Sequence, residues 1–458
     1  MFAETLSNFS DNTAVVLESQ NAISYLQLQK YVDLFSQKLN QTSSRKLIFL
    51  PCYNSLASLV AYLACLRSKH PVLLLDPALS DDWKQQLIER YRPNYIVEAV
   101  GETPGLVHLS SVTLNIHPDL ALLLSTSGST GSPKQVKISY KNIQSNANSI
   151  VQYLQLSADE RAITSLPMHY SYGLSVINSH LTAGGAIVLS EASVVSKDFW
   201  RSIKSNSVTS IVGVPYTYEI LYRLRFHNME LPSLRYMTQA GGKLDKKYIK
   251  YFANHLQNEN KRFYVMYGQT EATARMSYVP PENIVDVPES IGVAIPDGHF
   301  TLEHDDGTLI TKPHEIGELV YRGPNVMMGY ALSDADLEAD SVSSELKTGD
   351  LAKFDDQGYF FVTGRKNRFI KLSGNRIDLG EIEAKLLDQG WVGYCVGNDQ
   401  GLYVITDNLL WKELIKRYLC DSLRLHHSIV AVHVMKDIPR LANGKINYGA
   451  LLMVMVGN

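Results

Sequence analysis

A loop of small and hydroxylated residues that ends in a lysine has the composition of a polyphosphate-binding site. Residues 125–134 read Ser-Thr-Ser-Gly-Ser-Thr-Gly-Ser-Pro-Lys. Glycines let backbone N–H groups approach phosphate oxygens, hydroxyls add donors, and a lysine adds a point charge. A flexible linker is the alternative, but a linker would not follow an apolar strand directly or end in Pro-Lys. We predict that these residues bind phosphate: Ser125, Thr126, Ser127, Gly128, Ser129, Thr130, Gly131 and Lys134.

The sequence before this loop predicts its place in the fold. Residues 120–124 form an apolar run that predicts a buried strand. The loop would then leave the carboxyl end of a sheet, which is where α/β proteins usually bind ligands. The common P-loop requires lysine directly after glycine, whereas Ser132 and Pro133 stand before Lys134 here. The pattern therefore indicates a phosphate loop of another kind.

A second group of polar residues follows a predicted strand at 262–266. It reads Tyr-Gly-Gln-Thr-Glu-Ala-Thr from Tyr267 onward. A tyrosine ring can stack on a purine, and Thr270 can donate to a phosphate. Glu271 offers the hard oxygen that Mg²⁺ prefers. Taken alone, the group could equally be a strand end that runs into a helix cap.

Two further motifs are ambiguous by themselves. Asp350, in a Thr-Gly-Asp sequence, could accept hydrogen bonds from two vicinal hydroxyls or could be a turn aspartate. Residues 438–446 read Ile-Pro-Arg-Leu-Ala-Asn-Gly-Lys-Ile, in which Asn-Gly predicts a tight turn that presents Lys445. A lysine at such a turn would be unremarkable without the other motifs.

In their order along the chain, these motifs resemble those of the adenylate-forming superfamily. This superfamily includes acyl-CoA synthetases, adenylation domains of nonribosomal peptide synthetases and firefly luciferase. The resemblance extends from residues 23–26 to residue 446, which is nearly the whole chain. It is specific for the superfamily and does not single out one member.

The resemblance implies a role for each motif. Asp350 and Arg365 would contact the ribose, and Gly241 and Gly242 would border the adenine and the acyl carbonyl. The nucleotide-binding set comprises these residues, Tyr267 and the phosphate loop. Glu271 would be the metal ligand. The implied catalytic residues are Lys445, Glu271, Thr270 and Lys371.

The resemblance also implies the reaction. The chain would use ATP and Mg²⁺ to convert a small carboxylic acid to an acyl-adenylate with release of pyrophosphate. A phosphopantetheine thiol, of coenzyme A or of an acyl or peptidyl carrier protein, would then attack the adenylate. For this second step the C-terminal domain would turn about a hinge and bring in the strand 369–372 with Lys371. The hinge position holds Asn367, where the superfamily usually has Asp or Lys.

The segment that walls the acid pocket bears on the substrate. The implied pocket residues are His169, Tyr170, Val214, Gly241 and Ala272. Residues 169–181 contain no acidic residue that could pair with an α-ammonium group. Burying an ammonium without a counter-charge is costly, so we favour an acid without an α-amino group.

Two alternatives remain beside the thioester-forming ligase. One is a stand-alone amino-acid adenylating enzyme that loads a separate peptidyl carrier protein. The other is a nucleotide-binding protein without catalysis, against which the intact Lys134, Glu271, Asp350 and Lys445 weigh.

Composition narrows the class of protein. The 458 residues carry a net charge of -3, and 45% are hydrophobic and 19% charged. Charges are scattered, which argues against nucleic acid or an anionic membrane as the main partner. Four cysteines stand far apart, as expected for reduced thiols in a cytoplasmic protein. We expect no signal peptide and no membrane span.

The alternation of short apolar runs with helix-period segments predicts an α/β fold. We expect a large N-terminal domain, residues 1–365, with mostly parallel sheets flanked by helices. Glycines punctuate short strands in residues 316–361 and predict a small β-rich subdomain there. A small, mobile α+β C-terminal domain would follow at residues 366–458.

Overall fold

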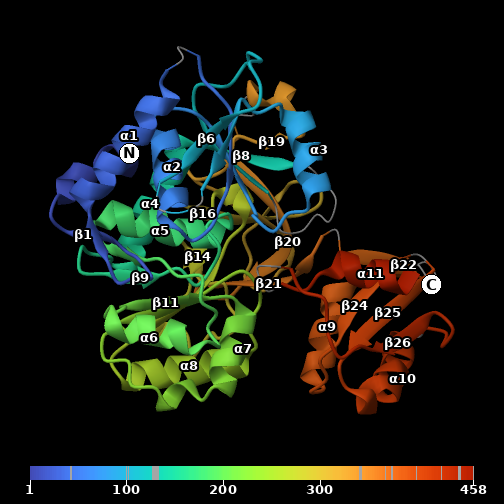
Figure 1. Ribbon diagram of the computed structural model, residues 1–458. Helices are drawn as coiled ribbons and strands as arrows, with labels where there is room; N and C mark the ends of the chain where they lie inside the picture. Colours follow the sequence, from blue (N-terminus) through green and yellow to red (C-terminus); the bar gives the residue numbers. More distant parts are fainter. Residues whose placement is uncertain are drawn as a thin grey trace. The chain divides into compact units, whose positions relative to one another are not determined.

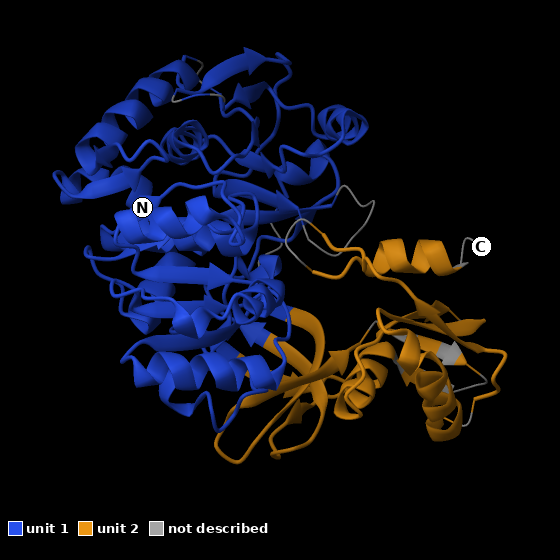
Figure 2. Cartoon of the chain, turned by 60° about the horizontal axis from the view of Figure 1, so that its bottom comes forward, with its two compact units in different colours: residues 1–126, 132–299, 321–346 blue, residues 127–131, 300–320, 347–458 orange. Residues whose placement is uncertain are grey.

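The computed structural model describes residues 1–41, 44–99, 101, 103–125, 134–339, 343–366, 368–372, 375–398, 400–423, 425–441 and 445–456. The chain forms two compact units (Figure 2). Unit 1 comprises residues 1–126, 132–299 and 321–346, and unit 2 comprises residues 127–131, 300–320 and 347–458.

Unit 1 contains a seven-stranded sheet, counted over the described residues, in the order β19-β8-β7-β4-β3-β5-β6. Its parallel strands are β3 (Ile48–Pro51), β4 (Val72–Leu75), β5 (Tyr95–Glu98) and β7 (Leu120–Ser125). Antiparallel pairing adds β6 (Gly105–His108) to β5, β8 (Gln135–Ser139) to β7 and β19 (Tyr330–Ala331) to β8. The predicted strand before the phosphate loop is therefore confirmed as β7.

A second sheet of unit 1 has nine described strands in the order β15-β14-β13-β12-β11-β9-β10-β1-β2. Its parallel strands are β1 (Thr13–Val16), β9 (Arg161–Ile163), β10 (Ala186–Val188), β11 (Ser210–Gly213), β12 (Tyr236–Gln239) and β13 (Arg262–Tyr267). Antiparallel pairing adds β2 (Ala22–Ser24) to β1 at one edge, and β14 (Ser277–Tyr278) to β13 and β15 (Val293–Ala294) to β14 at the other.

Helices cover both faces of these sheets (Figure 1). A shared core joins both sheets to α1 (Tyr25–Leu39), α2 (Leu56–Arg67), α4 (Tyr140–Leu154) and α5 (Ser171–Ala183). Helix α2 is apolar on all sides, which suits its full burial. The outer face of the nine-stranded sheet carries α6 (Lys197–Ser205), α7 (Pro215–Arg223) and α8 (Lys246–Asn258), and α3 (Asp81–Tyr91) packs on the seven-stranded sheet.

A five-stranded sheet of described residues, lying mostly in unit 2, has the order β17-β16-β18-β20-β21. Its strands are β16 (His299–Glu303), β17 (Leu309–Ile310), β18 (Gly317–Arg322), β20 (Glu345–Phe354) and β21 (Phe360–Arg365). This is the β-rich subdomain that the glycine pattern predicts, and it begins earlier than expected because β16 and β17 join it.

The C-terminal part of unit 2 has its own hydrophobic core. It contains β22 (Phe369–Leu372), β23 (Asn375–Asp378), α9 (Leu379–Asp388), β24 (Tyr394–Asn398), β25 (Gly401–Thr406), α10 (Lys412–Leu423), β26 (Val430–Val434) and α11 (Tyr448–Val456). The predicted α/β fold class is confirmed by these layers. The domain boundary near residue 366 stays a prediction.

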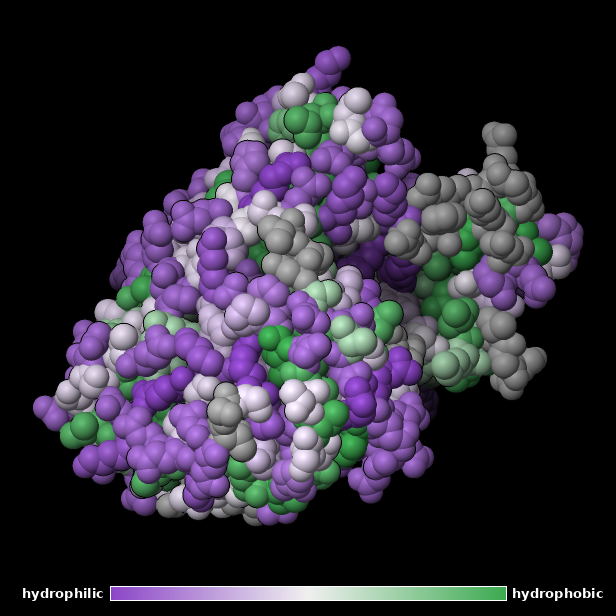
Figure 3. Space-filling view, turned by 90° about the horizontal axis from the view of Figure 1, so that it is seen from above, coloured by the Kyte–Doolittle hydropathy of each residue, from purple (hydrophilic) through white to green (hydrophobic). Residues whose placement is uncertain are grey.

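Exposed large hydrophobic residues are spread along the described chain. On the face in Figure 3, hydrophilic residues predominate and hydrophobic ones form small separate patches. Among the described helices, none combines the length and hydropathy that a membrane crossing needs.

Candidate active site

Most of the predicted site residues of unit 1 follow the parallel strands of the nine-stranded sheet. Val214 follows β11, Gly241 and Gly242 follow β12, and Glu271 follows β13. Strands β11, β12 and β13 are parallel neighbours. Their carboxyl ends therefore meet at one edge of the sheet, which brings these residues together.

Two predicted pocket residues, Tyr170 and Val214, lie beside a third, Gly241. Its φ is +87°, and a Cβ atom there would lie 2.6 Å from the Tyr170 hydroxyl oxygen and 3.1 Å from Val214 Cγ1. Any side chain would thus combine backbone strain with a clash. Tyr170 is half-buried at the start of α5, and Val214 is buried. Because Gly241 has no side chain, the space between Tyr170 and Val214 is left free at this position.

His169 has an acidic neighbour from the other sheet of unit 1. Its Nε2 atom lies 3.7 Å from Asp76 Oδ2, and Asp76 directly follows β4. Burial lowers the pKa of His169 although the Asp76 charge opposes this shift, so the ring is neutral at neutral pH. Its Nδ1 atom is buried and makes no hydrogen bond within the described part of the chain.

Glu271 and Lys134 meet at one tyrosine ring. Glu271 lies in the short 3-10 helix η4 (Thr270–Ala272), and its Oε1 atom accepts a 2.9 Å hydrogen bond from the Tyr330 hydroxyl. The Lys134 ammonium lies 3.3 Å from the centroid of the Tyr330 ring. The lysine predicted to bind phosphate and the predicted metal ligand therefore contact the same side chain, one at its ring face and the other at its hydroxyl.

The other members of this motif are also held in place. Thr270 Oγ1 lies 3.2 Å from Ser171 Oγ, and the Gln269 side-chain amide donates to the Tyr267 hydroxyl at 3.2 Å. A Cβ atom on Gly268 would lie 1.8 Å from the Ala274 carbonyl oxygen, so this tight turn requires glycine. Ala272 is fully buried.

The donor set fits Mg²⁺ with one protein carboxylate. Within the described residues, no group of three or more His, Cys, Asp and Glu side chains could hold a metal. Glu271 Oε2 makes no hydrogen bond in that part of the chain. Mg²⁺ commonly uses one or two carboxylates and takes its other ligands from water and substrate phosphates. Glu271 therefore suffices as the protein ligand.

The two predicted ribose contacts lie side by side in unit 2. Asp350 on β20 pairs across the sheet with Arg365 on β21, and Arg365 Nε donates to Asp350 Oδ1 at 2.8 Å. The Asp350 side chain is 4% exposed and that of Arg365 is 62% exposed. The Asp350 backbone N–H also donates to Thr348 Oγ1.

Lys445 lies three residues before α11. Residues 442–444 are outside the described residues, but Leu441 N donates to Lys445 O at 2.8 Å and Arg440 bridges to Ile446. Lys371 lies on β22, where it pairs with Arg376 of β23.

Part of the predicted site falls outside the described residues. This applies to Asn367 and to the phosphate-loop residues Thr126, Ser127, Gly128, Ser129, Thr130 and Gly131. The ends of that loop are described: Ser125 on β7 pairs with Gln135 on β8, and its hydroxyl donates to Gln135 Oε1 at 2.9 Å.

Sequence reasoning missed Tyr330 and Asp76. Tyr330 follows Gly329, but a Gly-Tyr pair carries no chemical signal by itself. Asp76 ends an apolar strand and could have been considered for that reason, because polar residues at strand ends often line sites.

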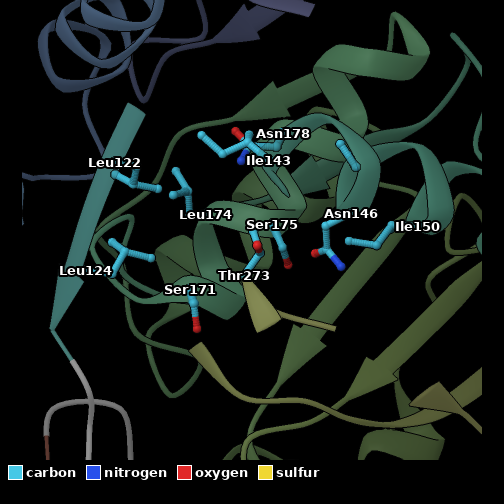
Figure 4. A pocket seen from close by; sticks show the side chains of 11 residues that line it. Leu122, Leu124, Ile143, Asn146, Ile150, Ser171, Leu174, Ser175, Asn178 and Thr273 are labelled. Carbon is cyan, nitrogen blue, oxygen red and sulfur yellow. The ribbon is translucent and has the colours of Figure 1, made fainter. Parts of the chain in front are cut away.

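A cavity lined in part by Ser171 and Thr273 is too small for a substrate. It has a volume of about 10 Å³, room for roughly one water molecule. Figure 4 shows Leu122 and Leu124 on its β7 side and Ser171 and Ser175 on α5. Its lining includes none of the predicted pocket residues His169, Tyr170, Val214, Gly241 and Ala272, so it is not the predicted acid pocket.

Known proteins resemble the chain over most of its length. A 2-succinylbenzoate–CoA ligase of Bacillus pumilus is 29% identical over 392 residues, which cover 82% of this chain and 77% of that protein. An L-proline–[L-prolyl-carrier protein] ligase of Pseudomonas fluorescens is 27% identical over 75% of this chain and 71% of its own length.

Solved structures share the fold. The o-succinylbenzoate CoA synthetase of Bacillus subtilis, solved with its acyl-adenylate intermediate, has a TM-score of 0.78 and 22% identity, and the match covers 98% of this chain and 97% of that chain. The same synthetase has been solved with ATP and a magnesium ion.

The AMP-binding enzyme family matches residues 2–331, well over half of the chain. This match and the similar ligases confirm the resemblance to the adenylate-forming superfamily. The chain belongs to the AMP-binding enzyme family.

Proposed function

We propose that the protein is an AMP-forming carboxylate ligase. It converts ATP and a small carboxylic acid to an acyl-adenylate and pyrophosphate, and then transfers the acyl group to the thiol of coenzyme A. The observation that carries the proposal is the corner in which Tyr330 contacts both Lys134 and Glu271. A lysine suited to phosphate and a hard metal ligand meet there, and Thr270, the neighbour of Glu271, contacts Ser171, which follows the pocket residue Tyr170.

The first half-reaction brings two anions together. A carboxylate must approach the α-phosphate in line, and charge must be neutralised as pyrophosphate leaves. Lys134 and the hydroxyls of residues 125–131 take the β- and γ-phosphates, and Lys445 neutralises the carboxylate and α-phosphate oxygens. Glu271 would hold Mg²⁺, which would supply further positive charge for the phosphate oxygens.

The remaining residues position the nucleotide and the acid. Asp350 accepts hydrogen bonds from the vicinal ribose hydroxyls, and Arg365 holds that carboxylate in place. Tyr267, Gly241 and Gly242 border the adenine. The acid occupies the pocket lined by His169, Tyr170, Val214 and Ala272, with Thr270 donating to a phosphate oxygen.

Transfer to the thiol requires other residues of unit 2. In this proposal the C-terminal domain turns about Asn367 and brings in β22 with Lys371. An uncharged hinge residue can still form hydrogen bonds, so the turn needs no charge at this position.

The charges near the pocket bear on whether the acid carries an α-amino group. Residues 169–181 carry no acid, and Asp76 lies beside His169. Asp76 Oδ1 accepts a hydrogen bond from Ala78 N at 2.9 Å, which ties that carboxylate to its own loop. We therefore favour an acid without an α-amino group.

One relative supports a second candidate function. The carrier-protein ligase of Pseudomonas fluorescens is similar over three quarters of this chain. A stand-alone amino-acid adenylating enzyme that loads a peptidyl carrier protein is therefore the alternative. The two candidates differ in both the acid and the acceptor.

Pyrophosphate release with a panel of acids tests the proposal. Aromatic and aliphatic acids and the twenty amino acids are each incubated with enzyme, ATP and Mg²⁺, first alone and then with coenzyme A or a phosphopantetheinylated carrier protein. We expect acid-dependent formation of AMP and pyrophosphate and an acyl-CoA product. Release only with amino acids, and transfer only to the carrier protein, would favour the alternative.

A further inference from the structure

A short segment of unit 1 ties its two sheets together at the proposed active site. Strand β19 pairs with β8 of the seven-stranded sheet, with Tyr330 opposite Val136. Two further backbone hydrogen bonds, Met328 N to Lys137 O at 2.8 Å and Lys137 N to Gly329 O at 2.9 Å, extend this pairing. Gly329 has a φ of +97°, which lets the chain turn directly before Tyr330.

The same segment is bonded to Glu271, which lies between β13 and β14 of the nine-stranded sheet. Met327 N donates to the Glu271 carbonyl at 2.9 Å, and the Tyr330 hydroxyl donates to the Glu271 carboxylate at 2.9 Å. One backbone contact and one side-chain contact therefore fix Glu271 relative to the edge of β8. Lys134 directly precedes β8, so the same pairing sets its place as well.

The hydroxyl and the ring face of Tyr330 each contact a charged group. The hydroxyl contacts an anion and the ring face contacts the Lys134 cation at 3.3 Å. A cation over a tyrosine ring is attracted by about 0.5–1 kcal/mol at exposed sites. A hydrogen bond to one oxygen of a ligating carboxylate orients its other oxygen toward the metal, and losing such a contact typically lowers metal affinity about 10- to 100-fold.

We propose that Tyr330 is a positioning residue for nucleotide binding: its hydroxyl aims the Glu271 carboxylate at Mg²⁺, and its ring holds the Lys134 ammonium toward the triphosphate. This inference rests on the proposed function. It assigns the hydroxyl to metal binding, through Glu271, and the ring to phosphate binding, through Lys134.

The two contacts can be separated by substitution. Tyr330→Phe removes the hydroxyl and keeps the ring, whereas Tyr330→Leu removes both. Tyr25→Phe is the matched control, because the Tyr25 hydroxyl donates a 2.7 Å hydrogen bond to the Gly185 carbonyl, away from the residues named here. If Tyr330 only fills space, Tyr330→Phe should behave like this control.

The experiment measures ATP binding by calorimetry with and without Mg²⁺, so that no acid substrate is needed. We expect Tyr330→Phe to reduce the Mg²⁺-dependent gain in ATP affinity about tenfold or more and to bind metal-free ATP as the wild type does. Tyr330→Leu should in addition weaken metal-free ATP binding about two- to fivefold. Tyr25→Phe should retain both wild-type affinities.

The possible results separate this inference from the proposed function. A wild-type protein that binds no ATP would overturn both. ATP binding by the wild type, with the full Mg²⁺-dependent gain kept in Tyr330→Phe, would overturn the role of the hydroxyl and leave the ligase proposal standing. Equal metal-free affinities of Tyr330→Phe and Tyr330→Leu would overturn the role of the ring.

Discussion

The predicted charged residues of the two units are held in different ways. In unit 1, Lys134 and Glu271 are connected through Tyr330 and through backbone pairing to both sheets. In unit 2, Asp350 is held by its cross-strand partner Arg365, and the Lys445 backbone is bonded to Leu441 beside the bridge between Arg440 and Ile446. Long-range pairing fixes the first group, and local hairpins fix the second.

This difference suggests a division of labour. Groups that the sheets hold rigidly suit the binding of ATP and Mg²⁺, because little order is lost on binding. Lys445, whose described backbone bonds are local, suits a contact that forms only as negative charge develops in the transition state. Substitution of Lys134 or Glu271 should therefore change affinity, and substitution of Lys445 should change rate.

Lys445→Ala should have the largest effect. We expect adenylation to fall about 10²-fold, as for the loss of one transition-state contact, with ATP affinity nearly unchanged. Single-turnover pyrophosphate release and calorimetry measure the two quantities. Lys436, an exposed lysine of the same unit, provides the control variant Lys436→Ala. Loss of ATP affinity in Lys445→Ala would break the contrast between the units.

Glu271→Gln should raise the Mg²⁺ concentration needed for half-maximal pyrophosphate release about tenfold. The amide oxygen can still accept from Tyr330, so the substitution tests the charge alone. Glu282, which is exposed, gives the matched variant Glu282→Gln. An unchanged Mg²⁺ titration would argue against Glu271 as the metal ligand.

Mild acid should destabilise unit 1 before unit 2. Burial lowers the pKa of His70 and of His180 to about 4. Each neutral ring accepts a hydrogen bond, His70 from Lys46 N and His180 from the Tyr236 hydroxyl. Since the unfolded chain binds these protons near pH 6.5, the stability from both rings is complete above that pH and declines as pH falls toward 4.

At pH 5.5 this effect amounts to about 1 kcal/mol for each ring. In unit 2, the side chains of His304 and His314 are 42% and 59% exposed, so neither ring is buried as those of His70 and His180 are. Hydrogen exchange at pH 7.5 and 5.5, corrected for intrinsic rates, should show faster opening of α5 and β12 than of β24 and β25. Equal acceleration in both units would contradict this expectation.

Some of these features could be predicted from the sequence and others could not. Local sequence accounts for the bounds of helix α3, Asp81–Tyr91, because Ser80 caps it and two aspartates occupy its first turn. The proximity of Asp350 and Arg365 also follows from a short antiparallel hairpin. Such features depend on residues close together in the chain.

The role of Tyr330 depends on contacts that local sequence does not reveal. It pairs with Val136 through a strand of two residues, and its hydroxyl reaches a side chain 59 positions away. The contact between His169 and Asp76 likewise joins the ends of strands from different sheets. The roles assigned to the site residues remain predictions.

A crystal structure with ATP and Mg²⁺ tests the central claim most directly. We predict the adenine beside Tyr267 and Gly241, the ribose hydroxyls on Asp350, and the metal about 2.1 Å from a Glu271 oxygen. A nucleotide bound away from the carboxyl ends of β12 and β13 would contradict the account.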